Sequence, residues 1–171
     1  MGKNEAGLDY GAAIRFYGDT LKKLIDLSRQ IDMQVNMITS LSSVLLAFSV
    51  TQIIQQHEPI TFAVLSVCMV CAVITALFAA HPPRFMRRAG QHQSAMYSKS
   101  IARYPSAVEY EEQLRSFLSD ADAMVGEYAR EIYNLSKYYY IPKRKLYLIS
   151  RNFFVSGIAL ATTTFIVTLV I

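Results

Sequence analysis

The chain has 171 residues, of which 53% are hydrophobic and 18% are charged, and its formal net charge is +4. A soluble domain of this length is usually about one quarter charged, so the composition favours an integral membrane protein over a soluble globular one. The length allows one domain rather than two.

Residues 1–32 are predicted to form an amphipathic helix that leads into the membrane. Their apolar residues recur at alternating spacings of three and four, which is the a/d pattern of helices that pack lengthwise, as in a coiled coil. The residues of this first seam are Ile14, Tyr17, Leu21, Leu24, Ser28, Ile31 and Val35. No Pro or Gly follows Gly18 before the membrane, so one helix is expected from about Leu8 through the first span. Because residues 1–32 lack a cleavable signal pattern, the first span is expected to stay as an anchor.

Three charge-free runs are long enough to cross a membrane as helices. About twenty residues at ~1.5 Å rise per residue match the ~30 Å hydrocarbon layer. The predicted spans are residues 33–56, 60–81 and 152–171, and residues 57–59 form a short outer loop. The second span is expected to stop at His81-Pro-Pro-Arg84. Within it, Cys68 and Cys71 are interpreted as small packing residues, because a redox or zinc site needs thiolates and access to water.

Residues 82–151 are predicted to be helical but outside the membrane. The segment from Ser106 to Glu109 has the pattern of a capping box, which predicts a short helix that ends near Leu118. A longer helix is expected next, capped at its start by Ser119 or Asp120.

This longer helix carries a second seam with the same spacing of three and four. Its residues are Leu118, Ala121, Val125, Tyr128, Ile132, Leu135 and Tyr139. Pro142 is expected to kink or break the helix near Ile141. The two seams can bury each other within one subunit or between subunits. The expected fold is therefore all-α, with three transmembrane helices and a cytoplasmic helical extension made of the long N-terminal helix and the central helices.

The basic residues indicate how the chain crosses the membrane. Of the seventeen Lys and Arg residues, five precede the first span, twelve lie between the second and third spans, and none lies in the outer loop or after the third span. The positive-inside rule places both basic segments in the cytoplasm. The N-terminus and residues 82–151 are therefore expected inside the cell, and the C-terminus outside.

The central basic residues predict a surface that binds a phosphate or a nucleotide. Arginine pairs with phosphate oxygens in a bidentate manner, and a tyrosine can stack on a base. The candidate residues are Arg84, Arg87, Arg88, Arg130, Tyr133, Asn134 and Lys137. For the first three, and for residues 143–145, contact with anionic lipid headgroups is the alternative. For the last four, which share a helix face away from the second seam, the alternative is an ordinary solvated face.

Polar residues within the spans are candidates for a water-lined path. The predicted pore-lining residues are Asn36, Ser40, Ser43 and Gln52 in the first span and Ser156 and Thr163 in the third. The alternative is close helix packing by small and hydroxyl residues, for which Gly157 and Ala161 form a small-xxx-small pair. No charge lies in any span, which argues against a proton-coupled pump.

The sequence contains no motif that predicts an enzyme, a metal site or a cofactor. Its histidines, His57, His81 and His92, are far apart, and no Ser/His/Asp grouping, glycine-rich phosphate loop or H-E-x-x-H is present.

Four short patterns occur in a fixed order along the chain. Asp32 precedes a Ser-rich first span, and His81-Pro-Pro-Arg84 closes the second. The segment from Asp122 to Asn134 reads D-A-M-V-G-E-Y followed by I-Y-N, and Lys143 or Lys145 precedes Leu146 and the last span. In these features the chain resembles the Pycsar-type transmembrane effectors of bacterial anti-phage defence. It departs from the family pattern at Gln34, where the family has a lysine, and around Met96 and Tyr97, where the family has an aromatic run.

This resemblance implies a partner enzyme, a nucleotide cyclase or nucleotidyltransferase, and an outcome, depolarisation of the bacterial inner membrane. The signal could be a cyclic mononucleotide, a cyclic oligonucleotide or a linear oligomer, and it could open or restrain the membrane part.

The primary hypothesis is an ion channel or pore former that is gated by such a nucleotide signal. Three spans cannot enclose a pore, so a homo-oligomer with closed symmetry is expected, with four subunits as the working number. The alternative is a non-conducting, membrane-anchored helical scaffold that recruits a protein partner. A third possibility is a subunit of a larger transporter.

Overall fold

The computed structural model describes residues 9–83 and 94–170, and every regular element in them is a helix. The chain divides into two compact units. We call them the head unit, whose described residues are 9–27 and 94–140, and the span unit, whose described residues are 28–83 and 141–170. The expected all-α fold is confirmed.

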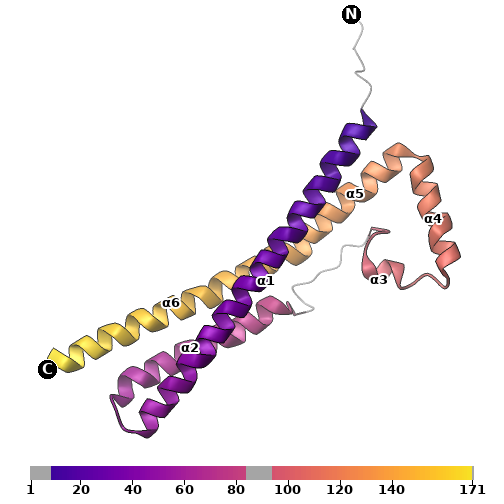
Figure 1. Cartoon of the computed structure of the whole chain (residues 1–171). Helices are drawn as coiled ribbons and strands as arrows, with labels where there is room; N and C mark the ends of the chain where they lie inside the picture. Colours follow the sequence, from indigo (N-terminus) through magenta and orange to yellow (C-terminus); the bar gives the residue numbers. More distant parts are fainter. Residues whose placement is uncertain (1–8, 84–93, 171) are drawn as a thin grey trace, which may run out of the picture. The chain divides into compact units, whose positions relative to one another are not determined.

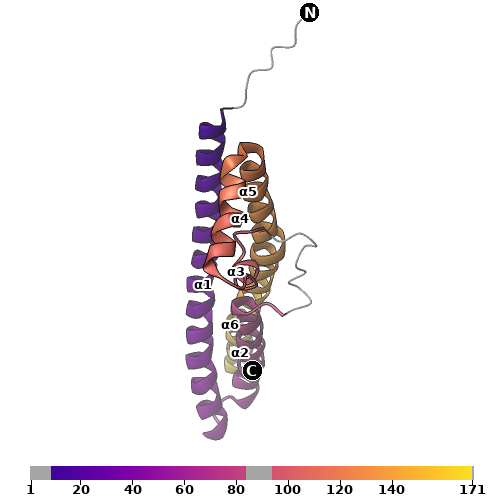
Figure 2. The same ribbon diagram turned by 90° about the vertical axis from the view of Figure 1, so that its right-hand side faces the viewer.

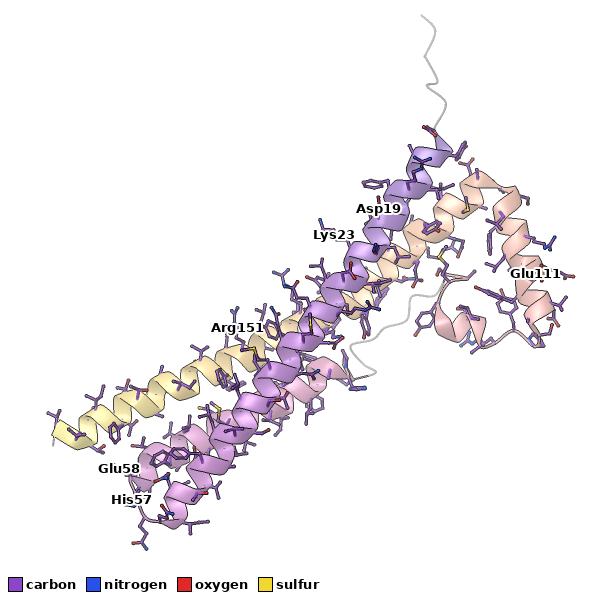
Figure 3. All side chains as sticks on the ribbon, in the orientation of Figure 1. Asp19, Lys23, His57, Glu58, Glu111 and Arg151 are labelled. Carbon is purple, nitrogen blue, oxygen red and sulfur yellow. The ribbon has the colours of Figure 1, made fainter. Side chains whose placement is uncertain are left out.

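The first two helices form a hairpin in the span unit (Figure 1). Helix α1 covers Tyr10–Ile54 and helix α2 covers Pro59–Ala80. Figure 3 shows His57 and Glu58 at the turn that joins them. Gln56 and Glu58 adopt left-handed backbone conformations, with φ of 58° and 41°, which reverse the chain direction. Pro59 then occupies the first turn of α2, where its missing N–H and fixed φ are tolerated.

Helix α6, Ile141–Val170, completes the span unit. Like α1 and α2, it contains an apolar stretch long enough to cross a membrane. At ~1.5 Å per residue, the 22 residues of α2 are about 33 Å long, which matches the hydrocarbon layer. Helix α2 ends at Ala80, with His81 as its C-cap, as the two following prolines predicted. The chain is thus a multi-pass membrane protein.

Small residues bring α2 and α6 into close contact. Ala72 and Ala76 of α2 are fully buried, and so is most of Gly157 in α6. A Cβ atom added to Gly157 would lie 2.6 Å from the Cβ of Cys68 and 2.9 Å from the Cε of Met69, so only glycine fits there. The Ser150 hydroxyl also donates a 2.7 Å hydrogen bond to the Ala72 carbonyl. The predicted small-residue packing at Gly157 is confirmed, and Cys68 packs beside it as an apolar residue.

A continuous buried seam runs along α1 in the span unit. Its buried residues are Ser28, Ile31, Val35, Ile38, Ser42 and Ser49, so the predicted spacing of three and four continues past Val35 into the membrane. Leu45 and Leu46 of α1 pack against a core made of Leu65 and Met69 of α2 and Ala161 of α6. The rings of Phe48 and Phe62 meet edge to face, with centroids 5.7 Å apart. Apolar side chains from all three helices therefore form one core.

The head unit contains the start of α1 and a set of shorter helices. These are α3 (Ser98–Ile101), α4 (Ala107–Ser119), α5 (Ala121–Leu135) and the π-helical turn η1 (Ser136–Tyr140). The Ser106 side chain accepts the Glu109 N–H at 3.2 Å and so caps α4, and Asp120 accepts the Asp122 and Ala123 N–H groups and so caps α5. Both predicted caps are confirmed.

The start of α1 is tied to the start of α5 within the head unit. The Tyr10 hydroxyl donates a 3.0 Å hydrogen bond to the Asp122 carboxylate. That hydrogen bond and the charge of Asp122 raise the pKa of Tyr10. Further along α1, the residues Ile14, Tyr17, Leu21 and Leu24 of the predicted seam are half-buried.

Two expectations for the central region need correction. Leu118 does not belong to the second seam: it lies on α4 and is 68% exposed, because Asp120 ends α4 and starts α5. The other seam residues, from Ala121 to Tyr139, are half-buried. Pro142 does not break the chain's helical path. It lies in the first turn of α6, and the wide turn η1 before it accommodates the missing N–H.

We expect Gly157→Ala to destabilise the span unit by about 1–3 kcal/mol, because the new methyl group overpacks against Cys68. Denaturant titration of the protein in detergent micelles measures this change. The matched control is Gly126→Ala in α5, where an added Cβ meets nothing within 4 Å. This control should be neutral or stabilising, by about 0.5–1 kcal/mol. Equal effects of the two substitutions would contradict the packing argument.

Candidate functional site

A buried lysine joins α1 to α6 in the span unit. Lys143 is 0% exposed and is the largest fully buried side chain among the described residues. Its Nζ lies 2.6 Å from the Asp32 Oδ1 and donates a 3.4 Å hydrogen bond to the Ser28 Oγ. Ser28 and Asp32 are one helical turn apart on α1, so the ammonium reaches both from a single position.

The pair with Asp32 compensates a charge that is costly to bury. Removing an ammonium from water costs several kcal/mol unless a counter-charge and hydrogen bonds replace the water. The Asp32 side chain remains 46% exposed, so the carboxylate keeps part of its hydration. Lys143 therefore does not reach lipid headgroups, and that interpretation is wrong for this residue. Arg144 and Lys145 are exposed, and for them it stays a prediction.

The predicted phosphate-binding residues do not form one group. Arg84, Arg87 and Arg88 lie outside the described residues. Tyr133 and Lys137 lie together: the Lys137 ammonium contacts the Tyr133 hydroxyl and is 4.9 Å from the centre of the Tyr133 ring. That contact, with a further contribution from Tyr138, raises the pKa of Lys137, so its charge is retained at neutral pH. Asn134 beside them is half-buried.

Arg130 has different neighbours, because it pairs with Glu127 and lines an open cavity of the head unit. The cavity has a volume of about 340 Å³. Tyr133, Asn134 and Lys137 do not line it. Its lining includes Ser94, Ser100, Arg103, Tyr104, Phe117, Glu127 and Arg130.

Sequence reasoning missed most of this cavity. Arg103 and Tyr104 follow α3 in a stretch with no helical periodicity, and Phe117 lies on α4, so no spacing rule connects them with α5. The sequence offers one local signal, Arg103 followed directly by the aromatic Tyr104, and it offers none for Phe117. The tertiary fold of the head unit brings them together.

The predicted pore-lining residues of α1 lie on its exposed side, with one exception. Asn36, Ser40 and Ser43 are exposed and follow a spacing of four and three. At about 100° per residue this stripe lies roughly opposite the buried seam of α1. The Ser43 hydroxyl returns to the Thr39 carbonyl at 2.8 Å. Gln52 is half-buried and lies about 150° around the helix from the stripe, on the side of the seam.

Helix α6 has a similar exposed stripe. Ser156 and Thr163 are exposed, and they lie on the far side of the helix from the buried Gly157 and Ala161. The Thr163 hydroxyl bonds to the Ala159 carbonyl of its own helix at 2.9 Å. Each of the two helices thus presents an apolar or small-residue side to the core of the span unit and a polar stripe away from it.

The two ends of the span unit differ in charge. Figures 1 and 2 show the turn between α1 and α2 and the C-terminal end of α6 at the same end of this unit. That turn carries His57 and Glu58, while Arg151 lies on α6 away from it (Figure 3). An up-and-down order of three spans places the basic residues of α6 opposite the α1–α2 turn, which is the arrangement that the positive-inside rule uses.

These features define a class: a multi-pass helical membrane protein with a second helical unit and an ion pair that joins helices α1 and α6. The described residues contain no cluster of three or more His, Cys, Asp or Glu that could hold a metal ion.

A family model described as the Pycsar effector protein domain matches residues 16–171, and the chain belongs to this family. The resemblance seen in the sequence is thereby confirmed. Effectors with this domain are membrane effectors, and Pycsar effectors respond to cyclic nucleotide signals made by a cyclase. No curated protein and no solved structure compared with the chain matches it.

The two members of the ion pair should respond differently to removal. Asp32→Ala leaves a buried ammonium without its counter-charge. We expect the free energy of unfolding to fall by about 2–3 kcal/mol, which is less than for a fully buried pair because the Asp32 carboxylate is half-exposed. Lys143→Met fills the same space without a charge and should lower the free energy of unfolding by about 1 kcal/mol or less. Denaturant titration in detergent measures both.

The exposed Lys145→Met is the control and should be neutral. A double variant Asp32→Ala/Lys143→Met should be more stable than Asp32→Ala alone. The assignment is wrong if Lys143→Met is the more damaging single change.

Proposed function

We propose that the chain is an oligomeric membrane effector, an ion channel or pore former that a nucleotide signal gates during anti-phage defence. On opening, it depolarises the bacterial inner membrane. The observation that carries this proposal is the pair of polar stripes on the exposed sides of α1 and α6. Family membership supplies the signal class, since Pycsar effectors respond to cyclic nucleotides.

A polar stripe that faces hydrocarbon is unstable in a single subunit. Serine and threonine hydroxyls can bond to a carbonyl of their own helix, as Ser43 and Thr163 do. The Asn36 carboxamide has two N–H donors and one acceptor, which one helix cannot satisfy in the same way. Unsatisfied polar groups in hydrocarbon cost several kcal/mol. Contact between subunits, or water enclosed by several subunits, relieves this cost.

The proposed assembly follows from this constraint. Residues 33–56, 60–81 and 152–171 cross the membrane, and the N-terminus and residues 82–151 are cytoplasmic. Subunits arranged around a closed symmetry axis, with four as the working number, turn the stripe of α1 or α6 towards the axis. The head unit binds the signal made by the partner cyclase or nucleotidyltransferase. Binding shifts the equilibrium between closed and open arrangements because the ligand has a different affinity for each.

A non-conducting scaffold is the second candidate. The observation in its favour is the set of exposed apolar side chains in the head unit: Phe16 is 66%, Val108 63% and Leu118 68% exposed. Exposed apolar side chains of this kind are used for protein contacts. In a scaffold the spans would only anchor the head unit, and the polar stripes would serve association alone.

Ion flux from proteoliposomes separates these two functions. Proteoliposomes that contain the purified full-length chain should release a trapped ion in a way that depends on a cyclic nucleotide. Release occurs only with the nucleotide if the ligand opens the channel, and only without it if the ligand closes the channel. Absence of flux in every condition removes the channel and leaves the scaffold.

In the same assay, Asn36→Leu should greatly reduce flux, because each subunit loses interhelical hydrogen bonding of about 1 kcal/mol and the polar lining at that level. Met37→Leu is the matched control: Met37 is 64% exposed, next to Asn36, and apolar before and after the change. Flux from Asn36→Leu equal to that from the control would show that the α1 stripe does not line the path.

A further inference from the structure

We propose that the cavity of the head unit is the site that binds the nucleotide signal. This inference rests on the proposed function for the existence of a nucleotide signal. It assigns the signal to Arg103, Tyr104, Phe117 and Arg130, rather than to the exposed row of Tyr133, Asn134 and Lys137.

One side of the cavity is held in place by hydrogen bonds to helix α5. Ser94 is 0% exposed and donates a hydrogen bond to the Glu131 carboxylate, and the Ala95 N–H donates a 2.8 Å hydrogen bond to Glu127. Glu127 itself is only 5% exposed. Two carboxylates of α5 therefore hold the segment that starts at Ser94 against the helix. A site that is formed before binding avoids the cost of ordering it around the ligand.

Two arginines of the cavity can bind one phosphate group. Arg103 is exposed, and within the described part of the chain its side chain makes no hydrogen bond or ion pair. The Arg130 side chain is 44% exposed, and its guanidinium pairs with Glu127. Guanidinium groups bind phosphate oxygens by paired, charge-assisted hydrogen bonds. An incoming phosphate competes with Glu127 for Arg130, while Arg103 needs no such exchange.

Two aromatic side chains of the cavity can stack on one nucleobase. Tyr104 and Phe117 both line the cavity and are both half-buried. The Tyr104 ring is supported by Tyr110, with ring centroids 5.2 Å apart. Aromatic faces stack on nucleobases of any identity, and the polar Ser100 lines the same cavity.

The size of the cavity fits a single nucleotide. A volume of about 340 Å³ is at the small end of ligand sites. One pair of arginines and one pair of aromatic rings match one phosphate and one base. A cyclic dinucleotide has two of each, so half of it would lie outside the cavity. Cyclic mononucleotides should therefore bind more tightly than a cyclic dinucleotide.

Binding to the purified full-length protein in detergent tests the site without reference to ion flux. The probes are the four 3′,5′-cyclic mononucleotides of A, G, C and U, and 3′,3′-cyclic di-GMP. Calorimetry should show at least one mononucleotide that binds more tightly than the dinucleotide. For it, Arg103→Ala should weaken binding by about tenfold or more, because the phosphate loses a charge-assisted pair.

Three further variants sharpen the result. Arg115→Ala is the matched control, since Arg115 is exposed on α4 and pairs with Glu111 instead. Lys137→Ala tests the exposed row outside the cavity, and both should bind like the wild type. Glu127→Gln keeps an oxygen acceptor for the Ala95 N–H but releases Arg130, so it should bind the mononucleotide more tightly.

The possible results distinguish the site from the function. If the wild type binds a mononucleotide and Arg103→Ala binds as well as Arg115→Ala, the cavity is not the site, but control by a nucleotide stands. A larger loss in Lys137→Ala than in Arg103→Ala also overturns the cavity. If the wild type binds none of the probes, both this site and nucleotide control are wrong, and ion flux alone decides whether the protein conducts.

Discussion

The buried Lys143 constrains the span unit more than any other side chain among the described residues. A fully buried ammonium is tolerated only where the fold supplies a counter-charge, and Asp32 on α1 supplies it at 2.6 Å. The pair fixes which side of α1 meets α6 and at which level along both helices. Apolar packing alone defines such a register poorly, because one heptad of a seam resembles the next. A single ion pair removes that ambiguity.

Small residues then decide how closely the helices approach, and what remains exposed. Gly157 and Ala72 allow α6 to lie against α2 with a hydrogen bond from Ser150 across the contact. Helix α6 turns Gly157 and Ser150 inwards and leaves Ser156 and Thr163 exposed, while α1 buries Ser42 and Ser49 and leaves Ser40 and Ser43 exposed. The packing of one subunit thus leaves the polar outer stripes from which an oligomeric assembly is proposed.

Features that depend on local sequence could be predicted, and those that depend on tertiary contacts could not. The α1 seam, the caps at Ser106 and Asp120, and the end of α2 at His81 are each set by residues within a few positions of one another. Lys143 shows the limit of prediction from local sequence. Its position before the last span suggested a lipid contact, yet its partner lies more than a hundred residues earlier. Arg103 and Phe117 show it again, because no periodicity links them to Arg130.

The ion pair also restricts how the proposed gating can work. Both helices that connect the head and span units, α1 and the η1–α6 segment, cross the boundary close to this pair: Ser28 and Ile141 are the first residues of the span unit on each. Moving α1 against α6 at that level would break the pair and cost about 2–3 kcal/mol, since the Asp32 carboxylate is half-exposed. Complete reversal of a two-state equilibrium needs about 5.5 kcal/mol of differential ligand binding. A gate that breaks the pair would use about half of that energy, so a gating motion in which α1 and α6 move together is favoured. The wide turn η1 lies just before the pair, where a π-helical segment can adjust without disturbing Lys143.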